Sequence, residues 1–138
     1  MLTWSKLFIK FTALCFALLL ASGILLAQAE SEQQFPDVVS VDVRATGDNT
    51  FDFDVTISSP YDTPTRYADA FHVSTLTGQV LGERELLHDH QTEQPFTRDL
   101  YGVKIPPAIN VVIVQARDQK YGYGGNTVQV QLPGRNAP

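Results

Sequence analysis

Two runs of alternating apolar and polar residues constrain the fold of this chain more than any other feature of its sequence. Every second residue from Val39 to Val43 is a valine, and from Phe51 to Ile57 apolar residues alternate with Asp or Thr. A period of two is typical of a strand that buries one face. The segment between them, Thr46-Gly47-Asp48-Asn49, tolerates turn dihedrals, so the two runs predict an antiparallel hairpin.

Five further segments predict strands, and no helical periodicity follows residue 29. They are residues 67–75 and 80–87, joined by Thr77-Gly78, then a short strand at 96–100, residues 111–117 and residues 127–132. The run from Val111 to Val114 is apolar on both faces, so we expect it to be a central strand. Seven short strands at this spacing predict an all-β, antiparallel sandwich.

The first 29 residues predict an export signal. Lys6 and Lys10 precede an uncharged apolar run over residues 11–26, and Ala27-Gln28-Ala29 supplies the small residues of a cleavage site. We expect cleavage after Ala29; the alternative is an uncleaved run that serves as a membrane anchor. Leu14 precedes Cys15 where lipoprotein signals place a small residue, so we do not expect acylation there.

Cleavage would remove the only cysteine, tryptophan and methionine of the chain and leave 109 of its 138 residues. No disulfide is then available, and a single domain must be held by its core. We divide the mature chain into a flexible lead-in at 30–36, a sandwich at 37–133 and a C-terminal tail at 134–138. We expect it to be exported, periplasmic or extracellular, with no membrane span after cleavage.

Charge limits the classes of partner. Eight basic and 15 acidic side chains remain after cleavage, a formal net charge of −7, and the basic residues are dispersed along the chain. Phosphate backbones and anionic membranes attract clustered positive charge. We therefore expect no nucleic-acid partner, and the oligomeric state stays open.

The later half of the chain resembles fibronectin type III and related immunoglobulin-like domains. The resemblance rests on three segments: 100–106 (Leu-Tyr-Gly-Val-Lys-Ile-Pro), Val112-x-Val114-x-Ala116-x-Asp118, and Gly122-x-Gly124-Gly125. It extends over residues 38–132 and implies a seven-stranded immunoglobulin-like sandwich. Residues 88–98 also look like a stretch of uncharacterised small exported bacterial proteins. Neither resemblance implies an activity.

In a seven-strand antiparallel sandwich the loops after the second, fourth and sixth strands leave at one end, which we call the loop pole. These loops are residues 58–66, 88–95 and 119–126. They hold most of the side chains suited to binding or chemistry: Tyr61, Asp62, Arg66, His88, Asp89, His90, Glu93, Tyr121 and Tyr123. We therefore expect any functional site at the loop pole.

His88-Asp89-His90 is the sharpest local pattern. Two imidazoles with one residue between them project to the same side of an extended backbone, and Glu93 is a candidate third ligand. Zn(II) or Cu(II) suits these donors, whereas Cu(I) prefers sulfur, which the mature chain lacks. If Thr77-Gly78 closes its hairpin, His72 faces Glu83, about 16 Å along the strand from the row of His88. The alternative interpretation of the two histidines is a solvated polar loop.

A second candidate is a binding surface formed by Tyr61, Asp62, Tyr121 and Tyr123. Tyrosines on glycine-rich loops offer large contact areas with polar tips. The structural alternative is that the glycines make a tight connection and a tyrosine packs on the end of the core.

We do not expect an enzyme, because the chain has neither a Gly-x-Ser-x-Gly elbow nor a glycine-rich phosphate loop with its lysine. The sequence predicts a small exported interaction module that contacts an envelope protein or glycan through the loop pole. The alternative prediction is an envelope metal-binding accessory protein that uses His88-x-His90 and has Zn(II) or Cu(II) as its cofactor.

Overall fold

The computed structural model describes residues 31–136. The predicted signal peptide, residues 1–29, lies outside the described residues. In the described part no helix is long and apolar enough to cross a membrane.

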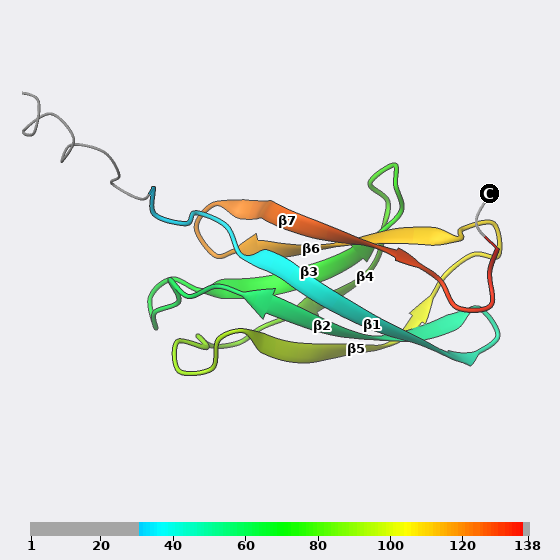
Figure 1. Ribbon diagram of the computed structural model, residues 1–138, viewed down its shortest axis with the longest axis horizontal. Coiled ribbons are helices and arrows are strands. Elements are labelled where there is room, and N and C mark those ends of the chain that lie inside the picture. Colours follow the sequence, from blue (N-terminus) through cyan, green and yellow to red (C-terminus); the bar gives the residue numbers. More distant parts are fainter. Residues whose placement is uncertain (1–30, 137–138) are drawn as a thin grey trace, which may run out of the picture. The chain divides into compact units, whose positions relative to one another are not determined.

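Seven antiparallel strands form two sheets, and residues 31–136 contain no helix (Figure 1). The strands are β1 (Asp37–Gly47), β2 (Thr50–Ser58), β3 (Ala68–Ser74), β4 (Val80–Glu85), β5 (Phe96–Lys104), β6 (Val111–Asp118) and β7 (Gly122–Gln131). One sheet has the order β1-β2-β5 and the other β4-β3-β6-β7. The all-β class and the number of strands are confirmed.

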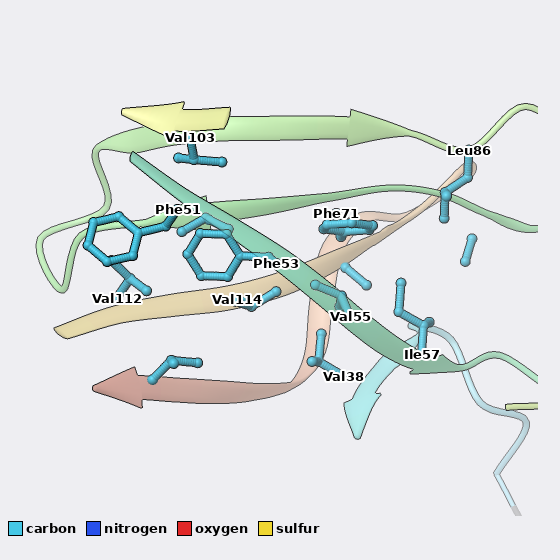
Figure 2. Close-up of a cluster of buried hydrophobic side chains, with 14 of the residues drawn as sticks. Val38, Phe51, Phe53, Val55, Ile57, Phe71, Leu86, Val103, Val112 and Val114 are labelled. Atoms are coloured by element: carbon cyan, nitrogen blue, oxygen red, sulfur yellow. The ribbon is translucent and has the colours of Figure 1, made fainter. Parts of the chain in front are cut away.

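The core lies between the two sheets (Figure 2). Phe53, Val55 and Ile57 of β2 are fully buried and face Phe71 of β3 and Val114 of β6, which are also fully buried. Burying side chains of this size stabilises a fold by about 1.5–3 kcal/mol each. The alternation predicted for residues 51–57 is thus the inner face of a strand.

A bulge in β1 changes the predicted alternation at its first valine. Val38 pairs with Ile57 and Ser40 with Thr56, so one extra residue stands in β1 between these pairs. Val38 is therefore buried and Val39 is exposed, whereas Val41 and Val43 pack against the core. A bulge shifts the side-chain phase by one residue, so the expectation that Val39 points inward is wrong.

The central strand, β6, and the last strand, β7, differ in detail from the prediction. β6 lies between β3 and β7, as expected, but its burial alternates, with Val112, Val114, Ala116 and Asp118 buried. β7 starts at Gly122 instead of residue 127, because Gly122–Gly124 pair with β6. Most of the glycine-rich segment is therefore strand.

The β3–β4 hairpin has the predicted register, since His72 pairs with Glu83 and Phe71 with Arg84. Arg84 pairs with Phe71, whose side chain is buried. Its own side chain is 40% exposed, because β4 is the edge strand of its sheet. Its guanidinium reaches β5 in the other sheet, where Nη1 lies 2.9 Å from Asp99 Oδ1 and donates to the Asp99 carbonyl. This ion pair bridges the two sheets along one side of the sandwich.

The lead-in is packed over its last four residues. Pro36 is fully buried, Phe35 contacts Gly124, and the Gln33 amide donates to the Phe35 and Ser58 carbonyls. Residues 33–36 of the expected lead-in thus make contacts with the sandwich. At the other end of the chain the Arg135 guanidinium donates to backbone carbonyls of residues 105, 106 and 109, which ties down the start of the expected tail.

Candidate functional site

The loops after β2, β4 and β6 lie together at one end of the sandwich (Figure 1). The Gln119 N–H donates to the Tyr67 carbonyl at 3.0 Å, and the His90 N–H donates to the Asp62 carboxylate at 3.0 Å. These bonds join the first loop to each of the other two. The loop pole is therefore a connected structure.

Asp62 links two of these loops from a buried position. It is 3% exposed, and its two oxygens accept hydrogen bonds from the backbone N–H groups of Ala68 and His90. Burying a carboxylate is costly unless such donors satisfy it. Asp62, which we expected on the binding surface, thus fixes the backbone that carries His90.

His90 is held between an aromatic ring and this carboxylate. Its imidazole stacks on Phe96, with 3.8 Å between ring centroids and an interplanar angle of 9°, and its side chain is 3% exposed. Nδ1 lies 3.9 Å from Asp62 Oδ2. Burial lowers the pKa of His90, and Arg98 and His88 lower it further. The ring is therefore neutral at pH 7.

His88 is exposed and lies beside His90. The two ring centroids are 4.7 Å apart, with an interplanar angle of 38°. His88 Nδ1 is 2.8 Å from the Asp89 carbonyl oxygen. Because a carbonyl only accepts, Nδ1 carries the proton, and Nε2 is the ring nitrogen that can offer a lone pair. The two rings are therefore neighbours, although the segment that carries them is irregular and not the extended strand that the prediction assumed.

Glu93 does not join the two histidines. Its carboxylate accepts two hydrogen bonds from the Arg98 guanidinium, at 3.0 and 3.3 Å, which lower the pKa of Glu93. Among residues 31–136 no group of three or more His, Cys, Asp or Glu side chains is arranged to hold a metal ion. The structure therefore brings together His88 and His90 but leaves out the predicted third ligand.

Beside the histidines, the surface is hollowed between the end of β4 and the start of β5. The hollow has a volume of about 390 Å³, and its lining includes charged, apolar and imidazole side chains: Arg84, Glu85, Leu86, Leu87, His88, His90 and Arg98. Leu87 is 80% exposed. Sequence reasoning did not single out Leu87 or Arg84 as site residues, although the predicted pairing of His72 with Glu83 also places Arg84 opposite Phe71.

Tyr61 and Tyr121 meet at the loop pole around Arg66. The Arg66 guanidinium carbon lies 4.3 Å from the centroid of the Tyr61 ring and 5.0 Å from that of Tyr121. Its Nε is 3.2 Å from a carboxylate oxygen of Asp118, whose side chain is fully buried. Tyr61 is half-buried and Tyr121 is 44% exposed. The cation of this cluster, Arg66, is therefore already paired with Asp118.

The same cluster changes the acidity of its members. Burial raises the pKa of Tyr61, and the adjacent Asp118 carboxylate raises it further. Burial would also raise the pKa of Asp118, but the Tyr61 hydroxyl beside it, two backbone N–H groups and Arg66 together lower it. Tyr61 is therefore neutral and Asp118 ionised at pH 7.

Tyr123 belongs to the sheet rather than to the loop pole, because it pairs with Arg117 within β6–β7. Its ring stacks on His72 with 4.0 Å between centroids, and its hydroxyl donates to Glu83 at 2.6 Å. The four predicted surface residues thus separate into three environments: Asp62 is buried, Tyr61 and Tyr121 flank Arg66, and Tyr123 stacks on His72.

Comparison with known proteins adds one relative. No protein-family model matches the sequence, and no solved structure matches it. A protein of Halomicrobium mukohataei named "Putative lipoprotein" is 38% identical over 102 residues, which cover 74% of this chain and 50% of that protein. The chain spans about half the length of the curated relative that it matches.

Proposed function

We propose that this chain is an exported, non-catalytic interaction domain that binds an envelope protein at the hollow beside β4 and β5. The observation that carries the proposal is Leu87, an 80% exposed apolar side chain that lines this hollow together with charged and imidazole groups. An apolar anchor surrounded by polar groups is the usual plan of a protein interface. A glycan, the other partner class that the sequence suggests, offers less apolar surface to Leu87.

The state of the polar groups at the loop pole supports a binding role over catalysis. Asp62 is occupied by backbone N–H groups, Glu93 by Arg98, and Asp118 by Arg66. The Ser59 hydroxyl accepts from the Gln94 amide. General acid–base and nucleophilic catalysis need such groups free and in reach of one another.

The order of the strands supports the finer assignment to a fibronectin type III-like sandwich. β4 lies in the sheet of β3, β6 and β7. In constant-type immunoglobulin domains the fourth strand instead joins the sheet of the first, second and fifth strands. We therefore assign the chain to the fibronectin type III-like arrangement.

Export is supported by the basic and apolar pattern of residues 6–29 and by the name of the relative, which indicates an envelope protein. We propose that the chain acts outside the cytoplasm. Cell fractionation and mass spectrometry of the N-terminus test this. A new N-terminus at Glu30 supports cleavage, an uncut chain in the membrane fraction supports the anchor, and an uncut chain in the cytoplasm refutes export.

A photo-crosslinking residue placed at position 87 tests the interaction. We expect it to join the full chain to one discrete protein in intact cells. Leu76 is the matched control, because it is also an exposed leucine, at 57%, but lines a different hollow with Thr75 and Ile109. Crosslinking at position 87 but not at position 76 supports the proposal. Equal products from both positions, or none from position 87, contradict it, and a product sensitive to glycosidase indicates a glycan instead.

A further inference from the structure

Each of the two histidines of the loop pole can offer one ring nitrogen, Nε2, as a metal ligand. Nδ1 of His88 donates to the Asp89 carbonyl, so its Nε2 is available. Nδ1 of His90 is buried without a hydrogen-bond partner and faces Asp62 Oδ2 at 3.9 Å. That negative charge favours the proton on Nδ1, which leaves the lone pair on Nε2. Carboxylates commonly orient metal-binding imidazoles by accepting a hydrogen bond from the second ring nitrogen; here Asp62 occupies that side of the ring but lies beyond hydrogen-bond distance.

The separation of the rings fits two ligands of one ion. A bond of about 2.0–2.1 Å from metal to nitrogen places the metal roughly 3.2 Å from each ring centroid. Centroids 4.7 Å apart then correspond to an angle of about 95° at the metal if both Nε2 atoms point to it. This angle is near that between adjacent ligands of tetragonal Cu(II) and also tolerable for tetrahedral Zn(II).

The charges around the hollow favour a cation over an anion. Arg84 is paired with Asp99 at 2.9 Å and Arg98 with Glu93 at 3.0 Å, so both guanidinium groups that line the hollow are neutralised. Glu85, which also lines it, forms no ion pair with Lys or Arg within residues 31–136. An anionic ligand would therefore meet an unpaired carboxylate and no free positive charge.

We propose that His88 and His90 bind one Cu(II) or Zn(II) ion through their Nε2 atoms, with Cu(II) preferred. Asp62 positions His90, and Glu93 takes no part because Arg98 holds its carboxylate. The ligand set thus differs from the three residues that the sequence suggested. Two protein nitrogens leave the remaining coordination positions to water. Cu(II) binds nitrogen donors more tightly than Zn(II) does, which gives the preference.

Titration of the full exported chain, purified without a His tag, with Cu(II) and then Zn(II) tests the site. We expect one Cu(II) per chain by calorimetry, and an electron paramagnetic resonance spectrum with coupling to two imidazole nitrogens. His88→Ala removes an exposed ligand that no core contact depends on, so we expect its affinity for Cu(II) to fall by at least about tenfold. His90→Phe keeps the stack on Phe96 and should lower the affinity similarly.

Two controls separate this ligand set from its alternatives. Glu93→Gln should leave Cu(II) affinity unchanged, whereas a large loss would restore the three-ligand arrangement and overturn ours. His72→Gln changes the third histidine, which lies on β3, and should also leave it unchanged. Absence of stoichiometric Cu(II) and Zn(II) binding, or wild-type affinity in both His88→Ala and His90→Phe, would overturn the proposal. Circular dichroism confirms that each variant is folded.

Discussion

Asp118 is the buried carboxylate whose removal should destabilise the loop pole most. It ends β6 with a fully buried side chain. One oxygen accepts hydrogen bonds from the backbone N–H groups of Lys120 and Tyr121, both at 2.8 Å. The other lies 3.2 Å from Arg66 Nε. We therefore consider Asp118→Ala, which removes these hydrogen bonds and the ion pair and leaves the donors without an acceptor.

The destabilisation can be worked out from the two backbone donors and the ion pair. Each backbone N–H without an acceptor costs about 1 kcal/mol at these partly buried positions, and removing the charged partner of Arg66 costs about 1–2 kcal/mol more. We discount the Arg66 ion pair because its side chain is 21% exposed. The sum is about 3–4 kcal/mol, which corresponds to a decrease in Tm of about 12–16 °C for a domain of this size.

Urea denaturation followed by circular dichroism and tyrosine fluorescence measures this free energy. The matched control is Asp54→Ala, which removes an aspartate from a well-exposed ion pair with Arg44. Exposed pairs contribute little, so this variant should unfold close to the wild type. A loss of stability below about 1 kcal/mol in Asp118→Ala, or equal losses in both variants, would refute the argument that buried donors depend on Asp118.

Two further predictions concern the packing of residues 33–36 and the titration of His72, the histidine of β3. A Cβ at Gly124 would overlap the Phe35 ring, so we expect Gly124→Ala to cost about 1–3 kcal/mol and to speed hydrogen exchange in residues 33–36. The control is Gly47→Ala, whose Cβ would meet only Thr50 at 3.8 Å; it should neither destabilise the domain nor speed this exchange. Slow exchange of residues 33–36 in both variants would contradict the packing of the lead-in. Burial, aided by Arg117, lowers the pKa of His72, so the unfolded chain takes up a proton first as the pH falls below about 6.5, and stability declines. His72→Phe should reduce that decline between pH 7 and pH 5 in urea midpoints, and an unchanged pH dependence would contradict this role.

The sequence predicted those parts of the fold that depend on neighbours along the chain. Alternation in residues 51–57 identified the inner face of β2, and Thr77-Gly78 set the pairing of His72 with Glu83. It could not predict the bulge that exposes Val39, because two registers with the same apolar pattern differ only in how β1 meets β2. Nor could it predict that Glu83, which faces His72 across the hairpin as expected, accepts a hydrogen bond from Tyr123.

In the candidate site, too, the sequence predicted what depends on neighbours along the chain and not what depends on tertiary contacts. The spacing of His88 and His90 predicted that their rings lie together, and the ring centroids are 4.7 Å apart, although His88 lies at a bend beyond the end of β4 and not in a strand. The role of Glu93 depended on a neighbour, Arg98, whose guanidinium is paired with the carboxylate. Local spacing cannot rank such competing partners.

The sequence by itself determined the all-β class, the seven strands, the register of the β3–β4 hairpin and the end of the sandwich at which His88 and His90 lie. Tertiary structure alone decided that Asp62 and His90 are buried, that Glu93 pairs with Arg98, and that residues 33–36 pack on the domain. The reason is physical. Strand periodicity is set by adjacent residues, whereas burial and ion pairing depend on side chains brought close from distant parts of the chain.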